Sequence, residues 1–282
     1  ADGTRFRVNV HYQKGSMAMA LRVIKSTIPD IETLGLPPIV RDLAHLARGL
    51  VLVTGPTGSG KSTTLASMVE QINRDYSRHI ITVEDPIEYQ FTSNASIIEQ
   101  REIGVDCPSF ASGLRHVLRQ DPDVILVGEM RDLETTSATI TAAETGHLVL
   151  STLHTLNASQ TVERIIDIYP ANQQSQIRTM LASTLQAVVS QTLFQSADGS
   201  GMVPAVEIMI CSSAVRNCIR ENRIFEIPSI IETGQRLGMQ SIDQSIAELL
   251  SRRCIHETEA LAKCADPTRM HTFLSRNVAE WA

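Results

Sequence analysis

The sequence predicts an α/β protein in which a mostly parallel, buried sheet carries a phosphate-binding loop. The apolar run 50–53 stops at Gly55, and the letters GPTGSGKS that follow fit the pattern G-x-x-x-x-G-K-[ST] of that loop. From residue 39 onward, short apolar runs alternate with segments of helical pattern, as in sheets covered by helices on both faces. A chain of 282 residues with 43% hydrophobic content can bury the large core that such a sheet requires.

The loop is expected to bind the phosphates of a nucleotide. Successive backbone N–H groups must turn inward around a polyphosphate, and glycines permit that backbone conformation. Lys61 would place a positive charge on the β and γ phosphates, and the Ser62 hydroxyl would ligate Mg²⁺. A glycine-rich turn without a ligand is the plain alternative, but here a strand leads in and a helix follows, whose N-terminus favours anions. The predicted nucleotide-binding residues are Gly55, Pro56, Thr57, Gly58, Ser59, Gly60, Lys61, Ser62 and Thr63.

Ahead of the sheet, the sequence predicts a hairpin and a linker. Residues 4–24 alternate between polar and apolar side chains and then run apolar, as in two strands joined at Lys14-Gly15. Residues 26–38 hold three prolines and no helical period, so we interpret them as a linker. The hairpin looks like the end of an earlier domain, and the chain starts at Ala1 within strand-like sequence, so we expect it to be a fragment.

The elements after residue 39 follow in the order of an α/β core. The helix that the phosphate loop opens runs to about Asn73; further strands are expected at 79–85, 123–129, 147–154 and 204–210, and further helices at 109–120, 133–145 and 158–169. Within 175–193, one helical stripe is predicted from Ile177, Met180, Leu181, Thr184, Leu185, Val188 and Val189. Beyond residue 210 the pattern is mainly helical as far as Trp281.

Composition excludes several classes of protein. A net charge of −6 argues against broad nucleic-acid binding, which needs a positive surface. The five cysteines are scattered without a C-x-x-C pair, which argues against zinc and disulfides and fits the reducing cytoplasm. No apolar run approaches the roughly 18 residues of a membrane span, and no signal peptide is visible.

Glu129 is the first catalytic candidate, because it ends the strand 123–129 at the sheet edge where the phosphate loop begins. Many phosphate-loop enzymes hold Mg²⁺ with an acid at the position that Gly128 occupies here, and glycine cannot bind a metal. We therefore expect Glu129 to orient or deprotonate the attacking water. A solvated carboxylate at a strand end is the alternative.

A second acidic group follows the strand 79–85. Glu84, Asp85 and Glu88 lie within five residues around a proline, which an exposed turn would also explain. Mg²⁺ requires oxygen ligands beyond Ser62 and phosphate, and Glu84 and Asp85 are the nearest candidates. Glu84 is also a catalytic candidate.

Two histidines bracket the strand 147–154, and each alone would more often be structural than catalytic. His147 and His154 fall on opposite faces of a strand, so a shared metal site is not expected. We expect His154 to sense the γ phosphate.

Four arginines are candidates to stabilise charge that develops on the phosphates. Arg115 and Arg119 are four apart and share a helix face, with no acidic partner at helical spacing, so they could meet phosphate in their own or a neighbouring subunit. Arg7 and Arg22 lie in the N-terminal hairpin and reach the nucleotide only if that hairpin folds over the core.

Four segments together resemble the secretion and pilus ATPase family, and the resemblance covers almost the whole chain. They are GPTGSGKST, ITVEDPIEY, LRQDPDVILVGEMRD and AETGHLVLSTLHT, in that order. The pair Gly128-Glu129, unusual for phosphate-loop enzymes at large, fits this family. Residues 214–221, AVRNCIRE, resemble a signature of its pilus-retraction branch, the PilT family, with Val215 and Cys218 as departures. The tetracysteine zinc insertion of the extension and type II secretion branches is absent from the sequence.

The resemblance implies a fold and a function. It implies a remnant of a PAS-like N-terminal domain at 1–25, a linker at 26–38, a RecA-like core at 39–210 and a helical C-terminal region at 211–282. It also implies a cytoplasmic homohexamer at the inner-membrane face, with ATP and Mg²⁺ at subunit boundaries and an inner-membrane platform protein as partner. ATP turnover in that hexamer would drive the removal of pilin subunits and so power pilus retraction. The rivals are an accessory retraction ATPase, itself a possible partner, and a type II or IV secretion motor. A RecA-like nucleic-acid motor and a small-molecule kinase are rivals from other classes.

The segment 214–221 carries a further expectation. Read as a helix, it places Ala214, Val215, Cys218 and Ile219 on one packing face. Arg216 and Arg220 are then four apart on another face, where like charges are unfavourable. We expect these arginines to transmit motion to a partner or a neighbouring subunit, and a solvated basic face is the alternative.

Overall fold

The computed structural model describes residues 5–24, 27–268 and 270. The strands are β1 Arg5–Gln13, β2 Ser16–Ile24, β3 Gly49–Thr54, β4 His79–Glu84, β5 Ile97–Glu102, β6 Val124–Val127, β7 Leu148–Leu153, β8 Leu185–Gln195 and β9 Met202–Ile210. The helices are α1 Ile39–Ala44, α2 Lys61–Asp75, α3 Phe110–Val117, α4 Leu133–Glu144, α5 Ala158–Asp167, α6 Gln174–Thr184, α7 Ser213–Arg220, α8 Ile227–Thr233, α9 Ile242–Ser251 and α10 Glu257–Lys263, with 3-10 turns η1 Ile224–Glu226 and η2 Gln235–Leu237.

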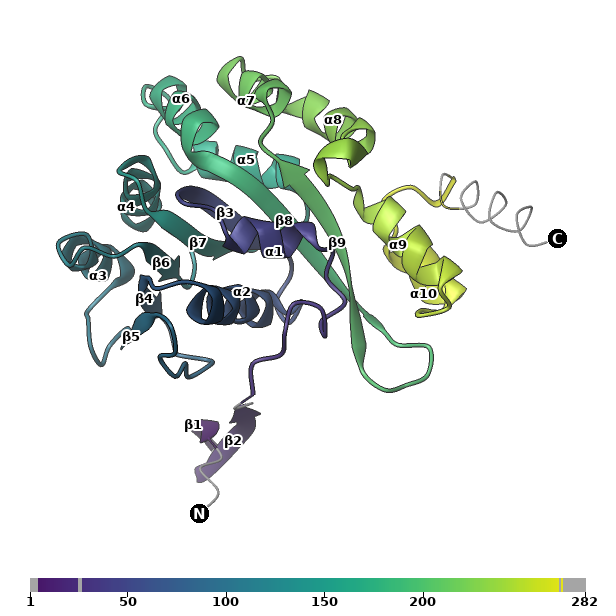
Figure 1. Ribbon diagram of the computed structural model, residues 1–282. Helices are drawn as coiled ribbons and strands as arrows, with labels where there is room; N and C mark the ends of the chain where they lie inside the picture. The colour runs from purple at the N-terminus through teal and green to yellow at the C-terminus, as the bar shows by residue number, and fades with distance from the viewer. Residues whose placement is uncertain (1–4, 25–26, 269, 271–282) are drawn as a thin grey trace.

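The central sheet is mostly parallel, as predicted. Its seven strands lie in the order β5-β4-β6-β7-β3-β8-β9, and only the β8–β9 pair is antiparallel (Figure 1). Parallel neighbours end at the same edge of a sheet, and ligands of open α/β sheets bind at that edge. The segments that follow β3, β4, β6 and β7 therefore meet there.

Two hydrophobic cores cover the two faces of the sheet. Along β3, Leu50 and Leu52 pack with helices α3 to α8, whereas Val51 and Val53 pack with α1 and α2. Side chains of a strand alternate between the faces, so a strand covered on both sides has no polar face. This explains the continuous apolar run from which the strand was predicted.

Side-chain caps mark the starts of several helices after the sheet strands. Ser109, Asp132 and Asn157 each accept a hydrogen bond from a backbone N–H in the first turn of α3, α4 and α5. A third, smaller core joins α9 and α10 to the β8–β9 pair, with Phe194 and Ala205 packed against both helices. The C-terminal helices therefore rest on the same strand pair that borders the phosphate loop.

The helix predicted across residues 175–193 is wrong in its second half. Helix α6 ends at Thr184, and Leu185 begins β8, which lies between β3 and β9. Val188 and Val189 are both fully buried, one on each face of the sheet. A strand buried on both faces has apolar residues at every position, and some of them fall at helical spacing by necessity. The edge strand β5 was not predicted, because its last four residues, Glu99 to Glu102, are all polar or charged.

The N-terminal hairpin is confirmed. Strands β1 and β2 pair with Arg7 opposite Arg22, and the turn lies at Lys14 and Gly15, both with positive φ. Residues 27–38 contain no helix or strand, as expected for the linker, yet Ile31 is buried against the α1–α2 side of the core. Trp281, the last residue of the predicted helical region, lies outside the described residues.

No helix within the described ranges is both long enough and apolar enough to cross a membrane.

Candidate active site

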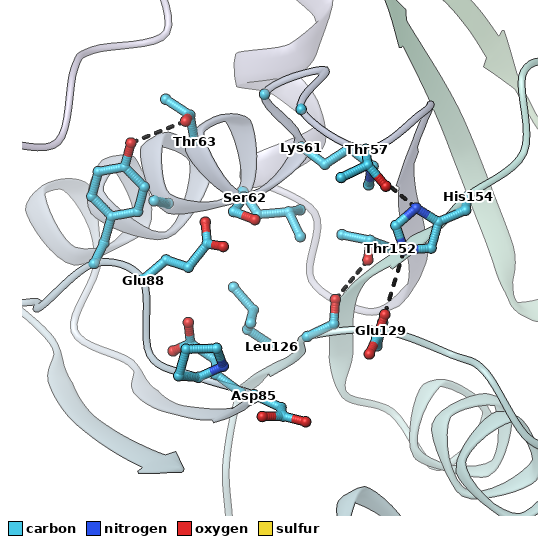
Figure 2. Close-up of a pocket in the computed structure, with 18 of the residues that line it drawn as sticks. Thr57, Lys61, Ser62, Thr63, Asp85, Glu88, Leu126, Glu129, Thr152 and His154 are labelled. Carbon is cyan, nitrogen blue, oxygen red and sulfur yellow. Dashed lines mark hydrogen bonds and ion pairs between the residues drawn. The ribbon is translucent and has the colours of Figure 1, made fainter. Parts of the chain in front are cut away.

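A pocket lies at the edge where the parallel strands end, as the motifs predict. It encloses about 600 Å³ and is lined by the phosphate loop and by the segments that follow β4, β6 and β7. A pocket of this volume is within the range of ligand sites. Figure 2 shows Lys61, Ser62, Glu129 and His154 around one space.

The phosphate loop has a backbone that only glycine tolerates at two of its positions. Gly55 and Gly60 have φ of +140° and +86°. A Cβ on Gly55 would lie 2.3 Å from the backbone oxygen of Gln191, and a Cβ on Gly60 would lie 2.8 Å from the side-chain Nε2 of Gln191. Gln191 of β8, which the sequence analysis did not single out, also accepts a hydrogen bond from Thr64 Oγ1 at 2.8 Å. Strand β8 thus packs directly under the loop.

Lys61 closes the loop upon itself. Its Nζ donates to the carbonyl oxygens of Gly55 and Pro56, each at 2.9 Å, and lies 3.4 Å from His154 Nδ1. Burial lowers the pKa of Lys61, and the nearby carboxylates of Glu129 and Glu88 oppose that shift. Both acids therefore favour the charged lysine that phosphate binding requires.

Glu129 lies beside Lys61 and is held from two sides. Its Oε2 is 2.6 Å from Arg131 Nε and 3.5 Å from His154 Nε2, and its side chain is 13% exposed. A Cβ on Gly128, the residue before it, would lie 3.4 Å from Glu84 Cα, which is an ordinary van der Waals contact. Arg131 lines the pocket but was missed, because nothing in the sequence indicates that a residue two positions after Glu129 turns back toward it.

Glu84, Asp85 and Glu88 line the opposite side of the pocket. Glu84 Oε1 accepts hydrogen bonds from Thr82 Oγ1 at 2.6 Å and from Gln100 Nε2 at 3.2 Å. Burial raises the pKa of Glu84, although these hydrogen bonds oppose the shift. Figure 2 shows the Glu88 side chain pointing into the pocket toward Ser62.

The pocket fits a nucleotide with Mg²⁺. Ser59 Oγ is buried without a hydrogen-bond partner inside the loop, where a phosphate ligand would bring acceptors. Ser62, Glu84 and Asp85 present hydroxyl and carboxylate oxygens, which Mg²⁺ prefers. No cluster of three or more His, Cys, Asp or Glu side chains suited to a metal occurs among the described residues. Phosphate oxygens would therefore have to complete the coordination.

The remaining candidates are divided between the pocket and the surface. His154 lines the pocket, whereas His147 Nδ1 lies 2.8 Å from the carbonyl of Ala142 at the end of α4. Arg7 also lines the pocket. The Arg22 side chain lies outside the described residues.

Arg115 and Arg119 do not line the pocket, and the expectation that they share a helix face is wrong. Helix α3 ends at Val117, so Arg119 lies beyond it and the two arginines share no helix face. Arg115 has an acidic neighbour, Glu134, whose Oε1 lies 3.7 Å from Arg115 Nη2. That neighbour comes from α4 and not from helical spacing, so the sequence could not indicate it.

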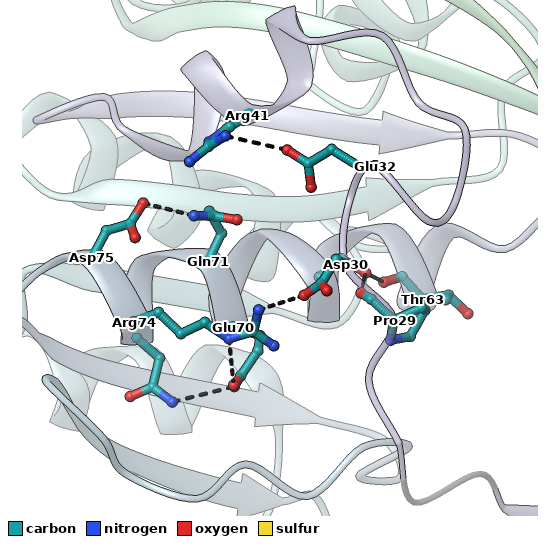
Figure 3. Close-up of polar contacts among 11 residues, drawn as sticks. Pro29, Asp30, Glu32, Arg41, Thr63, Glu70, Gln71, Arg74 and Asp75 are labelled. Atoms are coloured by element: carbon teal, nitrogen blue, oxygen red, sulfur yellow. Dashed lines mark hydrogen bonds and ion pairs between the residues drawn. The ribbon is translucent and has the colours of Figure 1, made fainter.

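Residues 27–38 contact the helix that carries the phosphate loop, as Figure 3 shows. Ser67 Oγ of α2 donates to the carbonyl of Pro29 at 2.6 Å, and Arg74 forms an ion pair with Asp30. The segment that leads to the N-terminal hairpin is thus attached along α2.

A phosphate loop at the end of a central parallel strand, with carboxylates delivered at the same edge by β4 and β6, defines a RecA-like phosphate-loop ATPase. The family model described as type II/IV secretion system protein matches residues 3–266, and the chain belongs to that family.

Several relatives resemble nearly the whole chain. A Neisseria gonorrhoeae twitching motility protein is 51% identical over 269 residues, which cover 95% of this chain and 72% of that protein. The type IV pilus retraction ATPase PilT of Pseudomonas aeruginosa is 46% identical over 93% of this chain and 76% of its own length. A crystal structure of the pilus retraction motor PilT with bound ADP is 49% identical with a TM-score of 0.89, covering 96% of this chain and 78% of that one.

Proposed function

We propose that this chain hydrolyses ATP and that the turnover powers retraction of a type IV pilus, the process behind twitching motility. One observation carries the proposal: a single pocket brings Lys61 of the phosphate loop together with Glu129 and His154. The similarity to a twitching motility protein and to PilT supports the same function.

The phosphate loop binds the triphosphate of ATP. Lys61 exchanges the loop carbonyls that it now contacts for phosphate oxygens, and the glycine backbone supplies N–H donors. Ser62 and Asp85 are the residues that we assign to Mg²⁺. When bound, the ion supplies neutralising charge on the phosphate oxygens.

Two carboxylates divide the work of hydrolysis. Glu129 orients the attacking water, because Arg131 and His154 hold its carboxylate beside the loop. Glu84, predicted both for the metal and for catalysis, accepts the proton, since burial raises the pKa of its carboxyl and so favours the protonated form. His154 Nδ1 lies near Lys61 and its Nε2 near Glu129, so it senses the γ phosphate between them.

The active site is shared between the subunits of a homohexamer. Arg115 and Arg119 are exposed and away from the pocket of their own chain, which suits a role in the neighbouring subunit. The finer assignments follow from the family resemblance: a cytoplasmic position at the inner membrane, a platform protein as partner, and contact with the accessory retraction ATPase. A net charge of −6 supports the exclusion of nucleic acid as a partner.

Paired variants test the enzyme activity. Lys61→Ala should lose nucleotide binding, whereas Glu129→Gln should bind ATP and hydrolyse it about 100-fold more slowly. Glu163→Gln on α5 removes the same charge at an exposed position and serves as the control. ATP affinity and phosphate release are measured in all three, together with pilus retraction in cells. Normal turnover in Glu129→Gln would end its proposed role, and retraction without turnover would end the motor function.

A further inference from the structure

Gln100 of the edge strand β5 lies where it can organise the acidic side of the pocket. Strands β4 and β5 are parallel, with Thr82 opposite Gln100 and Glu84 opposite Glu102. Residues two apart on a strand share a face, so Thr82, Glu84 and Gln100 lie on the same face of the sheet. Both Thr82 and Gln100 donate to the same oxygen, Glu84 Oε1.

The Gln100 amide makes three hydrogen bonds, each with a different part of the acidic segment. Its Nε2 donates to Glu84 Oε1 at 3.2 Å and to the Tyr89 carbonyl at 2.8 Å, while its Oε1 accepts from the Phe91 N–H at 2.9 Å. Two of these partners can only accept and one can only donate, so a single orientation of the amide satisfies all three.

The same segment is tied at two further points. The Ile87 N–H donates to Glu102 Oε2 at 3.0 Å, and the Tyr89 hydroxyl lies 3.0 Å from Thr63 Oγ1 at the start of α2. Strand β5 therefore holds the segment from one side and the phosphate-loop helix from the other. Gln100 also reaches the Glu84 carboxylate.

We propose that Gln100 is a positioning residue for ATP hydrolysis: it fixes the direction of the Glu84 carboxylate relative to the phosphate loop. Its amide locks the Glu84 side chain and the following backbone into one rigid unit. Hydrolysis depends on such placement more steeply than binding does, because a shift of about 1 Å at a reacting group costs roughly 100-fold in rate. The inference rests on the proposed role of Glu84.

Two substitutions test the proposal. Gln100→Met keeps the length of the side chain and removes all three hydrogen bonds, whereas Gln100→Glu keeps the acceptor for Phe91 and removes both donors. Each should lower kcat roughly 10- to 100-fold. ADP affinity should stay within about threefold, because the phosphate loop is intact. Gln176→Met and Gln176→Glu, at an exposed position of α6, are the matched controls and should leave both quantities unchanged.

A double-mutant cycle shows whether Gln100 acts through Glu84. Single-turnover assays with labelled ATP at high enzyme concentration measure the slow rate of ATP hydrolysis by the Glu84→Gln variant. There, adding Gln100→Met should cost no further rate, since the group that it positions is gone. An equal loss in both backgrounds would overturn the proposal, as would an unchanged kcat or a parallel loss of ADP affinity and Tm. Normal turnover in Glu84→Gln would instead remove the role of Glu84 itself, whatever Gln100 does.

Discussion

Arg216 and Arg220, four residues apart on α7, should differ sharply in their effect on stability. Arg216 Nη1 donates to the carbonyls of Ala182 and Ser183, the latter at 3.1 Å, and its Nη2 donates to Gln186 Oε1 at 3.0 Å. It therefore caps the C-terminal end of α6, where a positive charge also meets the negative end of the helix dipole. Arg220 is exposed.

The size of the effect follows from these contacts. A cation at a helix C-terminus with charge-assisted hydrogen bonds contributes about 1–2 kcal/mol. Arg216→Ala should therefore lower Tm by about 2–8 °C, whereas an exposed substitution such as Arg220→Ala stays within about 0.5 kcal/mol. Thermal and denaturant unfolding of the two variants and the wild type measure the difference.

Equal melting of the two variants would refute the capping role of Arg216. The contacts of Arg216 also mean that Arg216 and Arg220 do not share the single role that the sequence analysis expected. Of the predicted packing face, Val215, Cys218 and Ile219 are buried, but Ala214 is exposed. Since Arg216 supports α6, only Arg220→Ala tests transmission of motion cleanly. It should keep ATP turnover and lose pilus retraction.

Two further predictions concern pH and assembly. Burial raises the pKa of Glu207, whose Oε1 accepts from the Ala158 N–H, so the unfolded chain ionises first as pH rises. As pH rises above the usual carboxyl range, the free energy of unfolding of the wild type should fall relative to that of Glu207→Gln. Unfolding curves measured from pH 5 to pH 8 test this, and a difference between the two proteins that stays constant over that range would contradict it. Mixing Lys61→Ala with Arg119→Ala subunits should restore part of the ATPase activity if the site is shared, because one boundary type then holds both an intact loop and an intact arginine. No recovery in verified mixed hexamers would place Arg119 within its own chain or outside the reaction.

Burial on both faces made most of the sheet predictable and also caused the main error. The run at β3 and the apolar core of β4 have no polar face, and Gly55 ends the first of them with a motif that cannot occur inside a strand. Burial on both faces also explains the wrong prediction of a helix beyond Leu185, where β8 continues directly from α6 without a turn signal. Neither the apolar pattern nor a glycine or proline marks that boundary, and the partners that hold β8, namely β3 and β9, are distant in sequence.

The sequence predicted those site residues that lie at or just after the ends of the parallel strands. Lys61, Glu129 and His154 come after parallel strands and Glu84 ends one, so these residues meet once the four strands lie side by side in one sheet. Side chains that act across strands could not be found in this way. Gln100 and Gln191, for example, reach the site because β5 lies beside β4 and β8 lies beside β3. No local sequence pattern predicts that order of strands.

The charges around the pocket give a separate reason to expect a shared active site. Among the described residues that line it, the carboxylates are Glu84, Asp85, Glu88 and Glu129, and the cationic side chains are Lys61, Arg7 and Arg131. One of these cations, Arg131, is already within 2.6 Å of a carboxylate. The triphosphate adds further negative charge, which spreads over the equatorial oxygens during transfer. Mg²⁺ offsets part of it, and we infer that the rest is met by arginines of an adjoining subunit, for which the exposed Arg115 and Arg119 are available.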